Sequence, residues 1–151
     1  MNKLIQYVDI RVNEQSFELS RSKITSEICF IIEDQFFPEK NWNDFVVVIL
    51  TWWLHSLKKL MLSVDRSPCD FSFMDGPLLV RGKKIDNDII NLEFVREKLN
   101  GDEIQLTARC SVNQLRKSLI GAARKTVKII EAKMWDTEET RKLRRLLNSL
   151  N

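Results

Sequence analysis

The chain has a single histidine, which limits the catalytic arrangements that its residues can form. His55 follows the tryptophan pair Trp52 and Trp53 in an apolar segment. A Ser–His–Asp or Cys–His arrangement would have to use it as the base. The sequence has no P-loop, no G-x-G-x-x-G and no H-E-x-x-H motif. We therefore expect no enzyme, and a packed or partly exposed histidine. A small enzyme that uses His55 is the third hypothesis, after two binding functions.

The three cysteines also argue against a metal or redox site. Cys29, Cys69 and Cys110 are widely spaced and form no C-x-x-C pair. Each lies in an apolar or strand-like segment, where free cysteine behaves as a small hydrophobic residue. An odd number of such cysteines indicates a reducing compartment, so we expect a cytoplasmic protein with no metal and no cofactor.

Aspartates near the predicted sheet form the first candidate binding site. They fall in the connections that flank the first two strands of a predicted meander, and they are Asp65, Asp70, Asp75, Asp86 and Asp88. Loops on a rigid sheet often carry binding residues, and an acidic rim attracts a basic partner. The alternative is ordinary solubilising charge. For Asp75, which precedes Gly76, a role in a tight turn is the alternative.

Basic residues near the C-terminus form the second candidate site. Residues 111–151 hold 10 of the 24 Lys and Arg but only 4 of the 21 Asp and Glu. Five cations lie mostly outside the apolar stripe of a predicted helix: Arg116, Lys117, Arg124, Lys125 and Lys128. Such a face could neutralise phosphates, which predicts nucleic-acid binding. No aromatic residues interleave with these cations, so a solvated helix face is the alternative.

Alternating apolar residues predict strands on both sides of a central segment. Residues 4–12 alternate, and we expect residues 16–20 to pair with them in a hairpin. Residues 27–37 are nearly all apolar, which predicts one interior strand that ends at Pro38. Residues 70–110 predict a four-stranded antiparallel meander with a tight turn at Gly101.

The central segment predicts a very apolar helix that begins at Asn41 or Asn43, with Asp44 favoured by the helix dipole. Its predicted packing stripe comprises Phe45, Ile49, Trp52, Trp53, Leu57, Leu60 and Met61.

Two further helices are expected near the C-terminus. Ser111 is the predicted cap of a helix that extends to about Trp135. Asp136 and Glu139 predict a variant capping box for the last helix.

These elements predict one α+β domain over residues 1–151. We expect a mainly antiparallel sheet of about six to seven strands packed against the central helix, with one or two C-terminal helices. A hydrophobic content of 44% with 30% charged residues is typical of a globular chain. The alternating N-terminus predicts no secretory signal, and Lys58 and Lys59 interrupt the longest apolar segment before it reaches the roughly 18 residues of a membrane span.

The helix and the segment after it resemble a known family. The pattern W-x-x-F…W-W-L-x-x-L followed by F-x-F-M-D-G-P resembles small immunity proteins of bacterial polymorphic toxin systems, including contact-dependent growth inhibition. The matching residues cover about a quarter of the chain and are Trp42, Phe45, Trp52, Trp53, Leu57 and Phe71-Ser72-Phe73-Met74-Asp75-Gly76-Pro77.

The resemblance implies a cytoplasmic, non-enzymatic protein that binds and blocks one cognate toxin domain in a 1:1 complex. The toxin domain in such systems is often a nuclease. These motifs mark the scaffold, and the contact residues vary among such families, so none is carried over. Nuclease inhibitors tend to be acidic, whereas this chain has a pI of about 8.8. Either the aspartates act locally, or the toxin is not a basic nuclease, or binding lies away from its active site.

Overall fold

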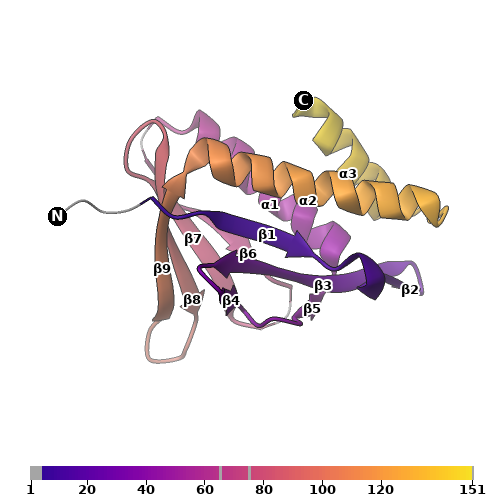
Figure 1. Cartoon of the computed structure of the whole chain (residues 1–151), viewed down its shortest axis with the longest axis horizontal. Helices are drawn as coiled ribbons and strands as arrows, with labels where there is room; N and C mark the ends of the chain where they lie inside the picture. The colour runs from indigo at the N-terminus through magenta and orange to yellow at the C-terminus, as the bar shows by residue number, and fades with distance from the viewer. Residues whose placement is uncertain (1–4, 65, 75, 151) are drawn as a thin grey trace.

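The computed structural model describes residues 5–64, 66–74 and 76–150 and has the predicted α+β class. Asp65 and Asp75 lie outside the described residues. The strands form two antiparallel sheets of five and four strands instead of one sheet. Figure 1 shows that the strands of the two sheets run crosswise and that α2 passes alongside β1.

The N-terminal sheet is built around one long strand. Its strands are β1 (Val8–Val12), β2 (Glu18–Ser20), β3 (Lys23–Ile32), β4 (Gln35–Phe37) and β5 (Asn43–Asp44), with a short 3-10 helix η1 (Glu14–Ser16) after β1. All four other strands pair antiparallel with β3, which confirms its interior position.

Two tight turns explain where the predicted strands of this sheet were wrong. Glu33 and Asp34 have φ angles of 47° and 69°, so residues 27–37 form two paired strands, β3 and β4, instead of one. Arg21 and Ser22 have φ angles of 50° and 69° and join β2 to β3 in the same way. Paired positive φ angles are typical of two-residue hairpin turns. Residues 18–20 therefore pair with β3 and not with β1.

The C-terminal sheet confirms the predicted meander. Its strands follow the order β6 (Cys69–Ser72), β7 (Leu78–Lys84), β8 (Ile89–Arg96) and β9 (Glu103–Ser111). Val80, Ile90, Leu92 and Phe94 are fully buried on its inner face.

An aromatic cluster joins the two sheets. The ring of Phe94 on β8 lies 5.7 Å from that of Phe30 on β3 and 5.3 Å from that of Phe37 on β4. Trp53 lies 5.1 Å from Phe30 and 5.2 Å from Phe73. These centroid distances are those of favourable tilted and edge-to-face pairs. Trp53 and Phe73, which belong to the segment with the family resemblance, are therefore part of the core.

The central helix α1 (Val46–Leu62) begins later than predicted. Asn43 and Asp44 pair with β3 as the short strand β5, and Phe45 takes the N-cap position without a side-chain hydrogen bond. Asp44 is buried, and its carboxylate accepts hydrogen bonds from Trp42 Nε1 (2.9 Å) and the Phe45 amide (2.7 Å). Asn43 and Asp44, which the sequence pattern assigned to the start of the helix, therefore belong to a strand.

The buried face of α1 differs from the predicted packing stripe, because Trp52 and Met61 are 40% and 42% exposed while Leu54, which the stripe left out, is fully buried. Two side chains of α1 cover the free edge of β6. Trp53 Nε1 donates to the Ser72 carbonyl (2.8 Å), and Ser56 Oγ donates to the Asp70 carbonyl (2.7 Å). Unpaired strand edges promote aggregation, and α1 removes that hazard here.

The two C-terminal helices are α2 (Val112–Ala132) and α3 (Glu138–Ser149). Ser111 caps α2 by accepting a hydrogen bond from the Gln114 amide, as predicted. The capping box of α3 is formed by Thr137 and Thr140, so the prediction of Asp136 and Glu139 was wrong. Within the part of the chain that the structure describes, each helix is too short or too polar to cross a lipid bilayer.

Candidate functional site

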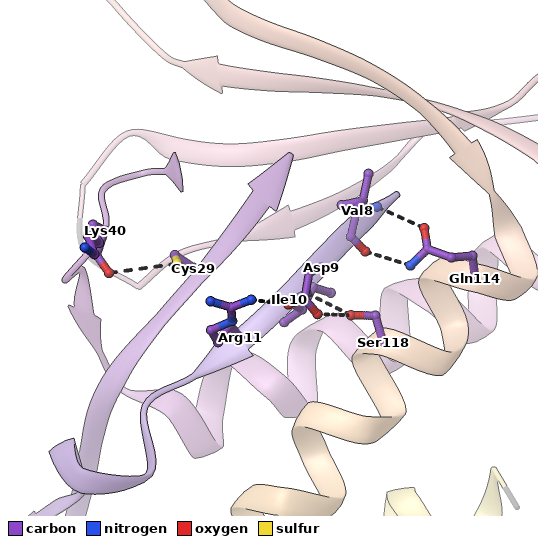
Figure 2. Close-up of polar contacts among 8 residues, drawn as sticks. All are labelled: Val8, Asp9, Ile10, Arg11, Cys29, Lys40, Gln114 and Ser118. Atoms are coloured by element: carbon purple, nitrogen blue, oxygen red, sulfur yellow. Dashed lines mark hydrogen bonds and ion pairs between the residues drawn. The ribbon is translucent and has the colours of Figure 1, made fainter. Parts of the chain in front are cut away.

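Helix α2 is fixed to the N-terminal sheet by side chains that replace a neighbouring strand. The Gln114 amide group accepts a hydrogen bond from the Val8 amide (3.0 Å) and donates one to the Val8 carbonyl (2.8 Å). Ser118 Oγ accepts from the Ile10 amide (2.8 Å) and donates to Asp9 Oδ1 (3.1 Å), as Figure 2 shows. Among the described strands β1 pairs only with β3. These contacts therefore give hydrogen-bond partners to backbone groups on the other edge of β1.

The outer side of α2 carries a group of cations that we call the basic face of α2. It consists of the exposed residues Lys117, Arg124, Lys125 and Lys128. Their spacings of three, four and seven residues put them on one side of the helix. The opposite side, which includes Leu115, Leu119 and Ile130, is buried. Four of the five predicted cations are therefore brought together.

The fifth predicted cation, Arg116, has a different role. Its guanidinium group is half-buried and donates a hydrogen bond to the Leu150 carbonyl (3.1 Å). It therefore tethers the end of α3 to α2, and we exclude it from the basic face.

The charges of the basic face are less compensated than those of α3. Lys125 forms an exposed ion pair with Glu14 at 3.3 Å, a kind of contact that contributes about 0–1 kcal/mol. Within the described residues, Lys117 and Lys128 have no ion pair. By contrast, three cations of α3 pair with nearby carboxylates: Arg141 with Asp136, Lys142 with Glu138 and Arg144 with Glu131. Lys117 and Lys128 therefore differ from these three cations of α3, whose charges are offset by nearby carboxylates.

The described aspartates have separate structural roles. Asp86 accepts hydrogen bonds from the amides of Asp88 (2.9 Å) and Ile89 (3.0 Å) and so shapes the β7–β8 turn. These bonds, assisted by Arg66 and Arg109, lower the pKa of the Asp86 carboxyl. Asp88 accepts a hydrogen bond from Ser111 Oγ (3.2 Å).

Asp70 lies on β6 away from this turn. Its carboxylate pairs with Arg81 Nε (3.3 Å), and Arg81 lies directly opposite Asp70 on β7. The β7–β8 turn begins at Ile85, four residues after Arg81, so Asp70 is roughly 13 Å from the turn along the strand. The structure thus brings Asp86 and Asp88 together and leaves Asp70 in an ion pair.

His55 and the cysteines do not form a reactive group in the described structure. His55 is exposed on α1, and the described residues contain no group of three or more His, Cys, Asp or Glu that could hold a metal ion. All three cysteines are buried free thiols. Burial raises the pKa of the Cys29 thiol to about 11 and that of Cys110 to about 12. Neutral buried thiols are poor nucleophiles, in agreement with the predicted packing role.

The sequence analysis missed a second group of cations on the open face of the C-terminal sheet. Lys83 on β7 and Arg109 on β9 both lie opposite Asn91 on β8. Strand alternation puts each of them on the polar side of its own strand. Their closeness follows only from the pairing register, which the sequence does not specify.

Comparison with known proteins gives no relative. No protein-family model, curated protein or solved structure matches the chain.

Proposed function

We propose that this chain is an immunity protein that binds one cognate toxin domain in a 1:1 complex and neutralises it in the bacterial cytoplasm. The observation that carries the proposal is the basic face of α2, an exposed surface on a helix fixed to the sheet by Gln114 and Ser118. The class of partner comes from the resemblance in the Trp42–Pro77 segment.

The positions of the resembling residues support a division between scaffold and recognition surface. Trp53, Phe71 and Phe73 are buried in the core that joins the sheets and α1. A toxin cannot contact these side chains without unfolding the protein. Recognition therefore belongs to exposed side chains outside this cluster, and the basic face of α2 is such a group.

The positive charge of the basic face of α2 indicates the charge of the surface that it binds. A fixed cluster of lysines and arginine steers an acidic partner towards it and raises the association rate. We therefore infer that the toxin domain presents an acidic patch to α2. An alternative is that Asp70, Asp86 and Asp88 imitate the negative charge of nucleic acid and bind a basic nuclease. We favour it less, because all three carboxylates already have partners within the protein.

Co-expression with the toxin domain encoded immediately upstream tests the proposal. We expect a 1:1 complex and rescue of cell growth. The double variant Lys117→Glu, Lys128→Glu should weaken the complex about tenfold or more, equivalent to about 1.4 kcal/mol. The control variant Lys58→Glu, Lys59→Glu makes the same change in net charge on α1. It should retain the wild-type affinity.

The possible results test the immunity function and the docking surface separately. Absence of both complex and rescue would reject the immunity function. A complex that both double variants weaken equally would retain the function but reject α2 as the docking surface.

A second candidate function is nucleic-acid binding by the same face. Lys117 and Lys128 are separated by eleven residues, which corresponds to roughly 16 Å of helix and spans several phosphates. This hypothesis predicts oligonucleotide binding that weakens steeply with added salt and is lost in Lys117→Glu, Lys128→Glu. No binding in a low-salt fluorescence titration would reject it.

A further inference from the structure

The outer face of the C-terminal sheet contains an open hollow lined by cations. It measures about 640 Å³ and is lined by Arg66, Lys83, Lys84, Ile85, Asn91 and Arg109. We call this group the basic hollow. It is built from the α1–β6 connection and from β7, β8 and β9, and it shares no residue with the basic face of α2.

The sheet register explains why these side chains converge. Lys83 is opposite Asn91, and Asn91 is opposite Arg109, so the three residues form one row across three strands. Neighbouring strands are about 4.8 Å apart, which places Lys83 and Arg109 within roughly 10 Å of each other. Asn91 adds an amide donor between two cations.

The adjacent row of the same sheet face provides a contrast. Arg81 is opposite Glu93 and forms ion pairs with Asp70 (3.3 Å) and Asp102 (3.5 Å), so its charge is compensated. Among the described residues, Arg66, Lys83 and Arg109 have no such ion pair. Lys84 donates only to the Ser63 carbonyl (3.4 Å). One row is therefore balanced, while the next has an excess of positive charge.

Nearby carboxylates offset this excess only in part. Asp86 is close enough for Arg66 and Arg109 to lower its pKa, but its Oδ1 is already bound to backbone amides. Asp88 is engaged by Ser111. The hollow therefore combines four cations with two nearby aspartates whose oxygens already accept hydrogen bonds within the protein.

We propose that the basic hollow binds a diphosphate group. A phosphoryl group carries up to about two negative charges near neutral pH, and its oxygens accept bidentate hydrogen bonds from guanidinium groups. Two linked phosphoryl groups supply several negative charges and acceptors for Arg66, Arg109, Lys83 and the Asn91 amide. The group can come from free inorganic diphosphate or from a nucleoside diphosphate.

Isothermal titration of the full chain with inorganic pyrophosphate and with ADP, at low salt and without divalent cations, tests this site. We expect saturable binding that Lys83→Gln, Arg109→Gln weakens about tenfold or more. Arg81→Gln, in the compensated row, should retain the wild-type affinity. Tighter binding of ADP than of pyrophosphate identifies a nucleotide as the source, and equal binding identifies free diphosphate.

Three results would overturn the inference. They are no saturable binding of either ligand by the wild type, equal binding by the Lys83→Gln, Arg109→Gln variant, and citrate binding as tight as pyrophosphate. The test is independent of the proposed toxin binding, because Lys117→Glu, Lys128→Glu leaves the hollow intact and should still bind pyrophosphate.

Discussion

At the scale of single residues, the adjacent tryptophans of α1 have opposite environments. Trp53 is fully buried, makes tilted and edge-to-face ring contacts with Phe30 and Phe73, and donates a hydrogen bond to the Ser72 carbonyl. Trp52 is 40% exposed. The two tryptophans have the same residue type and neighbouring positions in the helix, so a comparison of their alanine variants tests the effect of burial on stability.

Trp53→Ala should lower the free energy of unfolding by about 3–5 kcal/mol, because it leaves a cavity and an unpaired carbonyl. Trp52→Ala should cost less than about half of that, since much of the side chain already contacts water. Urea denaturation followed by circular dichroism measures both changes. Equal losses for the two variants would contradict the difference in burial.

The buried thiols predict a dependence of stability on pH. Burial raises the pKa of Cys29 and Cys110 to about 11 and about 12 from an ordinary value of 9.0. In the unfolded chain both thiols lose their protons first, so their contribution is complete below about pH 9 and falls as the pH rises towards the folded values.

The variant Cys29→Ala, Cys110→Ala should therefore show a smaller fall in unfolding free energy between about pH 8 and pH 10.5 than the wild type. All other ionisable groups are common to the two proteins, so their contributions cancel in the comparison. Urea denaturation at each pH measures the slopes. Parallel slopes would show that thiol ionisation does not contribute.

At the scale of elements, a helix covers one edge strand of each sheet with side-chain hydrogen bonds. Helix α1 uses Ser56 and Trp53 on β6, and α2 uses Gln114 and Ser118 on β1. These contacts make the helix positions specific, because each donor or acceptor must match one backbone group. They also hold the basic face of α2 in a fixed orientation.

Gln114→Leu should destabilise the fold by about 1–3 kcal/mol for each backbone group of Val8 left unpaired, since Val8 is fully buried. Asn113→Leu, at the exposed neighbouring position, is the control and should change stability by less than about 0.5 kcal/mol. Urea denaturation gives both values, and amide hydrogen exchange at Val8 should be faster only in Gln114→Leu. Unchanged exchange there would argue that the edge is closed by other means.

At the scale of the whole molecule, the aromatic cluster makes the two sheets one packing unit. Phe94 of the C-terminal sheet contacts both Phe30 and Phe37 of the N-terminal sheet. Because neither sheet can lose these rings without exposing the other, we expect a single cooperative unfolding transition.

Tryptophan fluorescence includes the signal of Trp42 and Trp53 in the cluster, and far-ultraviolet circular dichroism reports on all helices and strands. Their urea transitions should coincide, with midpoints that Phe94→Ala lowers equally for both probes. Two separated transitions in the wild type would show that the sheets unfold independently.

The sequence alone determined the elements whose signals are local. Alternation at Val8, Ile10 and Val12, the Ser111 cap and the meander over residues 70–110 were all predictable, because each depends on neighbours in the chain. Clustering of Lys117, Arg124, Lys125 and Lys128 was likewise predictable from helical spacing alone.

The tertiary structure decided everything that depends on distant partners. Strand pairing with β3 took Asn43 and Asp44 from the predicted helix start, and the turn at Glu33 and Asp34 divided one predicted strand into two. The division into two sheets and the row that joins Lys83 to Arg109 have the same origin. Pairing register and burial are properties of contacts between segments far apart in sequence, and no local pattern encodes them.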